Sequence, residues 1–288
     1  MTPRFAGKRR TYLIVALLLW LACTTIPVLW NYSQLYERIL DDRRFPALSR
    51  YALEPTPEIA LVGSSMIYRL YEGYFQTRLR NIAIGGRSPI TGLAIIASYS
   101  SVPPVIVVET NMLARTVEPA LVEKFGKNDA APFRWFWPDR VAISYFYYWL
   151  KYKSESENVA LLPRQPPSSY DIKASLDEAE AEYNSHGFDE QMAENAETLR
   201  RQVADLESRG CKIYFLEMPY PGNLGDSHFA QTARALAHKA FPERAKWPDI
   251  DYHVPELRWI DASHMDERSA IIVAREIDAF LGRATNSK

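Results

Sequence analysis

The amino-acid sequence predicts an α/β domain with a central parallel β-sheet, preceded by one transmembrane helix. Runs rich in valine, isoleucine and leucine, typical of strands buried on both faces, occur at 59–63, 81–84, 104–109 and 211–217. Stretches of helical length lie between and after these runs, at 66–79, 88–101, 191–209, 228–240 and 267–281. This alternation indicates βαβ units and an open sheet covered by helices, in which sites form beyond the carboxyl ends of the strands.

An uncharged apolar stretch lies near the N-terminus, at 11–30. As a helix it would be about 30 Å long, which is enough to cross the hydrocarbon core of a bilayer. The basic residues before it are Arg4, Lys8, Arg9 and Arg10. They predict that the N-terminus stays in the cytoplasm and that the rest of the chain is exported. A cleaved signal peptide and a buried core helix are the alternatives. We expect an uncleaved anchor, because no small-x-small cleavage site closes the apolar stretch.

The chain is therefore expected to contain a cytoplasmic N-terminus with the anchor at 1–32, a linker at 33–57 and one α/β domain at 58–288. Within the domain, about 115–190 breaks the alternation and is rich in aromatic residues, which indicates an insertion. The net charge of −1 argues against binding to nucleic acid. The chain contains no CxxC pair, and the sequence predicts neither a metal site nor a cofactor.

Two motifs at the ends of predicted elements could supply a nucleophile and a base. Ser65 follows the first strand, in Gly63-Ser64-Ser65, and directly precedes a predicted helix. A serine at this junction suits nucleophilic attack, because backbone amides at the start of a helix can stabilise an oxyanion. Near the C-terminus, Asp261 stands three residues before His264, where a carboxylate can orient an imidazole base. Taken alone, the serine motif is also an ordinary turn and helix cap.

Two further strand ends offer hydrogen-bond donors. Asn111 follows the third strand and Gly86 follows the second, so an amide side chain and a backbone N–H are available for an oxyanion. Arg69 and Arg87 follow the first two motifs and, with Ser64, are candidates for binding an anionic or hydroxylated substrate. For each arginine, a solvated surface position is the alternative.

Taken in chain order, these motifs resemble the SGNH (GDSL-type) hydrolase superfamily. The resemblance covers roughly 58–112 and 194–281, and it rests on Val62-Gly63-Ser64-Ser65, Asn81-x-Ala83-x-x-Gly86, Glu109-x-Asn111 and Asp261-x-x-His264. It implies a flavodoxin-like three-layer fold with Ser65 as the nucleophile, His264 as the base and Asp261 as its orienting carboxylate. Gly86, Asn111 and the Ser65 amide would form the oxyanion hole.

Two positions depart from the family pattern. Ser64 stands where the family usually has aspartate, which leaves open which of the two serines attacks, and Glu109 replaces a glycine. With the anchor, these departures are similar to the membrane-tethered branch that acts in bacterial surface-polymer acylation. This branch includes alginate-type and peptidoglycan O-acetyltransferases and the teichoic-acid D-alanine transfer protein.

The resemblance implies serine-dependent acyl transfer to a cell-envelope glycan or its precursor. It also implies a membrane-bound O-acyltransferase as partner, and a catalytic domain on the periplasmic side of a bacterial inner membrane. A carbohydrate esterase of the same fold is one alternative, because the first half-reaction is shared. A non-catalytic SGNH-like assembly or binding protein is the other.

Overall fold

The computed structural model describes residues 11–22, 45–126, 146 and 155–286. The chain divides into two compact units, one made of 1–53 and 128–151, the other of 54–127 and 152–288. The second unit contains the described β-sheet and all the residues that the sequence predicts for the site.

Four parallel strands form the sheet of this second unit, in the order β2-β1-β3-β4. Their bounds are Ile59–Val62 for β1, Arg80–Asn81 for β2, Val105–Glu109 for β3 and Lys212–Leu216 for β4. The residues of β1 are all buried, and so are those of β3 and β4 after the first position of each strand. The predicted α/β class with a buried parallel sheet is therefore confirmed.

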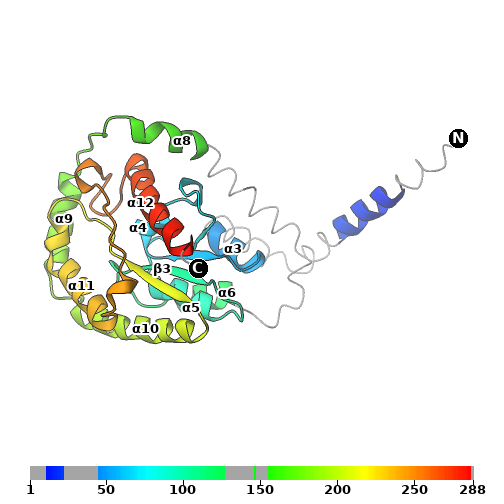
Figure 1. Cartoon of the computed structure of the whole chain (residues 1–288), viewed down its shortest axis with the longest axis horizontal. Coiled ribbons are helices and arrows are strands. Elements are labelled where there is room, and N and C mark those ends of the chain that lie inside the picture. Colours follow the sequence, from blue (N-terminus) through cyan, green and yellow to red (C-terminus); the bar gives the residue numbers. More distant parts are fainter. Residues whose placement is uncertain (1–10, 23–44, 127–145, 147–154, 287–288) are drawn as a thin grey trace. The chain divides into compact units, whose positions relative to one another are not determined.

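Helices cover both faces of the sheet (Figure 1). The helices on one face are α5 (Pro89–Ala97), α6 (Pro119–Phe125) and α10 (Asp189–Ser208), while α12 (Glu267–Asn286) lies on the other. The helix α11 (His228–Ala240) packs beside α10. The other described α-helices of this unit are α4 (Ser65–Tyr68), α8 (Glu155–Leu161) and α9 (Lys173–Tyr183). Both α8 and α9 fall within the stretch that the sequence predicts to be an insertion.

Glycine packing helps to bring α5 close to the sheet. A Cβ atom at Gly92 would lie only 2.7 Å from a side-chain carbon of Val62 on β1.

The start of α5 is set by the sequence itself, because Ser88 caps the helix through its side chain and Pro89 occupies the first turn.

The predicted helix at 66–79 is wrong in its length. The observed α4 ends at Tyr68, and a 3₁₀ turn, η1 (Glu72–Tyr74), follows it. The Nδ2 group of Asn81, from β2, donates to the carbonyls of Ile67 at 2.8 Å and Leu70 at 2.7 Å. These bonds satisfy carbonyls that a longer helix would use internally, so the chain can turn early.

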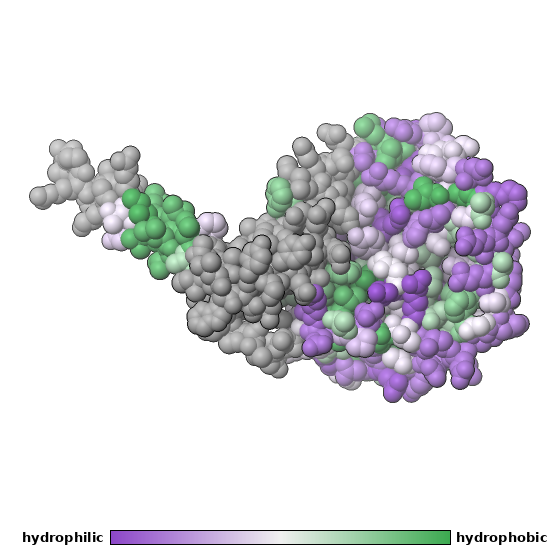
Figure 2. Space-filling view, turned by 180° about the vertical axis from the view of Figure 1, so that it is seen from behind, coloured by the Kyte–Doolittle hydropathy of each residue, from purple (hydrophilic) through white to green (hydrophobic). Residues whose placement is uncertain are grey.

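The described part of the first unit includes a helix at 11–22 and α3 (Pro46–Leu53). The visible surface of helix 11–22 is mostly hydrophobic, whereas the visible surface of the second unit is mostly hydrophilic (Figure 2). No helix within the described residues has both the length and the apolar character needed to cross a membrane. The rest of the predicted anchor, at 23–32, lies outside the described residues, as do the aromatic residues at 133–149 except Phe146. The helix α3 falls within the stretch expected to be a linker.

Candidate active site

The order of the strands places the candidate site at a reversal of the chain. From β1 the chain passes to β2 on one side, and it then crosses to β3 on the other side of β1. In open α/β sheets, the carboxyl edge at such a switch point is where ligands bind. Here β1 leads directly into Gly63, Ser64 and Ser65, and its neighbour β3 ends at Glu109.

The two adjacent serines have different environments. Ser64 is buried, its N–H donates to Oε2 of Glu109 at 2.5 Å, and its hydroxyl accepts from the N–H of Met66 at 3.3 Å. Ser64 is therefore the N-cap of α4. Ser65 is half-buried, and neither its hydroxyl nor its N–H makes a hydrogen bond with a described residue. Of the two serines, Ser65 is the one whose hydroxyl is available for chemistry.

Glu109 is a fully buried carboxyl group beside these serines. A Cβ atom at position 63 would lie 2.7 Å from its Oε2 atom, so only glycine leaves room for this approach. Its Oε1 atom has no hydrogen-bond partner among the described residues. Burial raises the pKa of Glu109, and the hydrogen bonds from Ser64 offset this only in part. The sequence marked Glu109 only as a departure from a family pattern.

Asp261 and His264 form a hydrogen-bonded pair in the loop before α12. Oδ2 of Asp261 lies 2.7 Å from Nδ1 of His264, and Oδ1 accepts the backbone N–H groups of Ser263 and His264, both at 2.8 Å. Partial burial opposes ionisation of Asp261, but these hydrogen bonds outweigh it and hold its pKa below the ordinary value. Nε2 of His264 makes no hydrogen bond with a described residue. This is the arrangement of an oriented imidazole with one nitrogen free to accept a proton.

A buried tyrosine, Tyr183, lies beside the Asp261–His264 loop. Burial raises the pKa of Tyr183, while the neighbouring Ser263 side chain and the charge of Arg115 lower it and the charge of Glu109 raises it. Tyr183 is the last residue of α9. No pattern in the sequence pointed to Tyr183 or Arg115. No hydrogen bond joins Ser65 to His264 in the described part of the chain.

The two residues predicted for the oxyanion hole differ in whether their hydrogen-bond donors are available. Gly86 adopts a left-handed conformation, with φ of 72°, its carbonyl accepts from Arg115, and its N–H makes no hydrogen bond with a described residue. Asn111 is 2% exposed, and its side chain holds the backbone of Met218 by two hydrogen bonds, from Nδ2 at 2.8 Å and to Oδ1 at 2.7 Å. One Nδ2 proton is left over, but the first role of this amide is to tie β3 to the segment after β4.

The two arginines predicted to bind substrate also differ. Arg87 forms an ion pair with Glu118, with 3.2 Å between Nε and Oε2, and both side chains are partly exposed. The half-buried Arg69 makes no side-chain hydrogen bond or ion pair within the described residues. Arg69 is thus the freer of the two cations.

A surface depression of about 410 Å³ lies beside η1, α8 and α12. Its lining includes Tyr74, Val159, Arg275 and Asp278, and none of the predicted site residues. Asp278 already accepts the backbone N–H groups of Gln76 and Thr77 at 3.0 Å each. This depression therefore does not belong to the candidate active site.

No protein-family model, curated protein or solved structure gives a significant match to this chain. The reasons for assigning a function are therefore the order of the motifs in the sequence and the geometry of the site.

Proposed function

We propose that this protein is a serine-dependent acyltransferase of the bacterial cell envelope, built on an SGNH-like domain. The observation that supports this most strongly is the 2.7 Å contact between Asp261 Oδ2 and His264 Nδ1, which leaves Nε2 unbonded. A carboxylate that holds an imidazole in one tautomer is what a serine nucleophile requires for proton transfer.

In the first half-reaction, Oγ of Ser65 attacks the carbonyl carbon of an acyl donor while Nε2 of His264 takes the hydroxyl proton. The N–H groups of Ser65 and Gly86 stabilise the negative charge that develops on the carbonyl oxygen. The bond to the leaving group then breaks, and His264 returns the proton to that group. The acyl chain remains on Ser65 as an ester.

In the second half-reaction, a sugar hydroxyl of an envelope glycan or its precursor gives its proton to His264 and attacks the ester. Ser65 recovers its proton as it leaves, and the glycan carries the acyl group. Water in place of the sugar would give the esterase reaction. The apolar stretch at 11–30 favours transfer, because an anchor would keep the enzyme beside a membrane-bound O-acyltransferase that delivers the acyl group.

The choice of Ser65 over Ser64 rests on hydrogen bonding. The Ser64 hydroxyl already accepts the Met66 N–H, and the residue is 1% exposed. Attack by Ser64 would cost α4 its cap, whereas attack by Ser65 breaks no hydrogen bond within the described residues.

A fluorophosphonate probe tests the proposal on the full-length protein in detergent. We expect covalent labelling of the wild type, loss of labelling in Ser65→Ala, and retained labelling in the matched control Ser64→Ala. His264→Ala should label at least about a hundredfold more slowly, because the serine loses its base.

Labelling of Ser65→Ala equal to that of the wild type would refute Ser65 as the nucleophile. A wild type that folds but does not react would favour the alternative of a non-catalytic binding protein. If labelling is as expected, incubation with acyl-glycan donors and mass measurement of the Ser65 peptide would identify the acyl group.

A further inference from the structure

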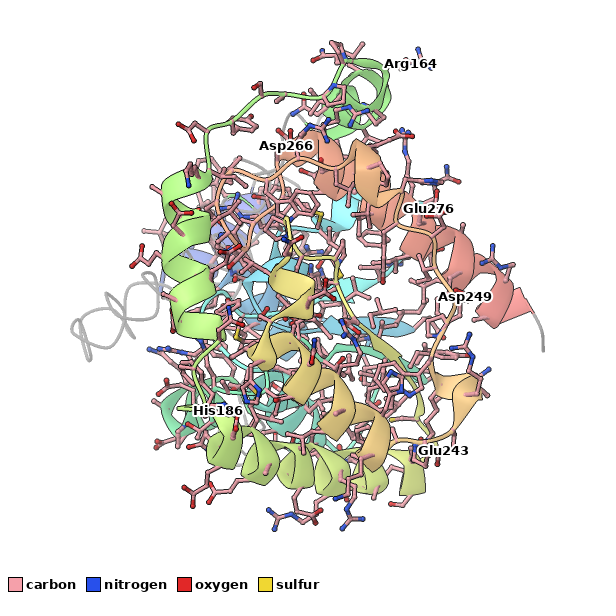
Figure 3. All side chains as sticks on the ribbon, turned by 90° about the vertical axis from the view of Figure 1, so that its left-hand side faces the viewer. Arg164, His186, Glu243, Asp249, Asp266 and Glu276 are labelled. Carbon is pink, nitrogen blue, oxygen red and sulfur yellow. The ribbon has the colours of Figure 1, made fainter. Side chains whose placement is uncertain are left out.

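Two histidines and an aspartate, none of them a residue of the candidate active site, meet where three helices begin or end. His186 lies in the loop between α9 and α10, Asp189 is the first residue of α10, and His228 is the first residue of α11. Figure 3 shows His186 beside the N-terminal end of α10, where the loop from α9 enters this helix. The sequence predicted no metal site, because His228 lies 39 residues after Asp189 in the chain.

The carboxylate of Asp189 stands between the two imidazoles. Its Oδ1 lies 2.7 Å from Nε2 of His228, and its Oδ2 lies 3.1 Å from Nδ1 of His186. The two imidazole ring centres are 4.0 Å apart. One potential ligand atom from each residue lies within 4.8 Å of those of the other two. One ligand atom from each of the three residues is therefore close enough to the other two to bind a common metal ion.

These separations are close to those in a metal centre. Ligand atoms about 2.1 Å from a tetrahedral Zn²⁺ ion are roughly 3.4 Å from one another. The two contacts to Asp189, at 2.7 Å and 3.1 Å, are hydrogen bonds to different carboxylate oxygens, so an ion would replace them after small shifts of the three side chains. The His186 side chain is 78% exposed and can rotate, while His228 is held at the start of α11.

We propose that His186, Asp189 and His228 bind a divalent transition-metal ion such as Zn²⁺. Imidazole nitrogens select zinc, copper and nickel over magnesium and calcium, which prefer oxygen ligands only. The three residues supply two nitrogens and one carboxylate oxygen, and water would complete the coordination on the exposed side.

The metal would link the start of α10, the start of α11 and the loop after α9. The same junction holds Tyr183, whose ring stacks on Phe229 with ring centres 4.6 Å apart, and Phe229 follows His228 directly. The bound ion would therefore stabilise the start of α11, where Phe229 packs against Tyr183. The inference does not depend on the proposed acyl transfer, because metal binding can be measured without a substrate.

The test is calorimetric titration of ZnCl₂ into the full-length protein in detergent, prepared with a tag that contains no histidine and stripped with EDTA. We expect one Zn²⁺ per chain and an affinity at least about tenfold lower in His186→Ala, in His228→Ala and in Asp189→Asn, because even supporting residues of metal sites cost this much when they are lost. The matched control is His253→Ala, since His253 also lies near two carboxylates, of Asp251 at 3.5 Å and Glu276 at 3.4 Å.

The proposal is overturned if the wild type binds no Zn²⁺ at concentrations up to about 100 µM, since a dissociation constant of this size corresponds to a binding free energy of only about 5 kcal/mol. It is also overturned if His253→Ala loses the ion as the three variants do. Asp189→Asn keeps the shape of the side chain, and His186 is exposed, so these two variants decide the question even if His228→Ala does not fold. Zn²⁺ should also raise the midpoint of thermal unfolding of the wild type but not of Asp189→Asn, because only a native-state ligand stabilises.

Discussion

Replacement of Glu109 tests whether its buried carboxyl group is neutral. If it is, Glu109→Gln keeps an oxygen that accepts the Ser64 N–H and introduces no change in charge. We expect its free energy of unfolding at about pH 4 to stay within about 1 kcal/mol of the wild type, because Glu109 then carries its proton in the folded chain and largely in the unfolded chain as well. Glu109→Ala removes the acceptor and leaves both an unsatisfied buried N–H and a cavity, so it should lose about 2–4 kcal/mol.

The pH dependence of stability gives the sharper result. Burial raises the pKa of Glu109 above its ordinary value of 4.5, so the folded chain holds a proton that the unfolded chain releases. Stability is then greatest below the pKa of the unfolded chain, and it falls as the pH rises toward the folded-state pKa. The slope approaches about 1.4 kcal/mol per pH unit for one proton. Glu109→Gln should lack this contribution.

Urea unfolding of the full-length protein in detergent, followed by circular dichroism at several values between pH 4 and pH 8, measures both effects. The unfolding free energy of the wild type, minus that of Glu109→Gln, should decrease as the pH rises from 4 and become constant above the folded-state pKa. Parallel curves for the two proteins over the whole range would refute the raised pKa. An unfolding free energy of Glu109→Ala equal to that of the wild type would refute the hydrogen bond to Ser64.

Three further substitutions follow from the site geometry. Gly63→Ala should lose about 1–3 kcal/mol in urea unfolding, because its Cβ would lie 2.7 Å from Glu109 Oε2; a neutral effect would contradict the packing. Asn111→Ala should lose about 2–4 kcal/mol, because both backbone groups of Met218 lose a buried partner; a loss of labelling with unchanged stability would instead indicate an oxyanion role. Asp261→Asn should slow fluorophosphonate labelling at least about a hundredfold by changing the histidine tautomer, and an unchanged rate would exclude this pair as the base.

The candidate site combines two kinds of residue. Ser64, Glu109 and Asn111 are buried and make structural hydrogen bonds, so they fix the ends of β1 and β3. Ser65 and His264 each keep a polar atom without a partner in the described residues, at positions that a substrate could reach. Fixed buried groups that support a few unbonded ones are what a preorganised site requires.

The buried parallel sheet and the positions of most helices could be predicted, because both depend on local patterns. Continuous valine and isoleucine runs indicate strands buried on both faces, and stretches of helical length lie between them. The Asp261–His264 contact could also be predicted, since three residues of loop suffice to bring the carboxylate to the imidazole. The length of α4 could not, because it depends on Asn81, which reaches the α4 carbonyls only after β2 pairs with β1.

The sequence by itself thus determined the α/β class, the order of the site motifs and the pairing of Asp261 with His264, because each is written in neighbouring residues. Only the tertiary structure decided which serine hydroxyl makes no hydrogen bond within the described residues. The N–H of Ser64 donates to Glu109 from another strand, and the Ser64 hydroxyl accepts the Met66 N–H. The tertiary structure likewise decided that Asn111 binds the Met218 backbone and that His186, Asp189 and His228 meet. These contacts join segments far apart in the chain, and side-chain partners at such separations depend on packing that no local pattern specifies.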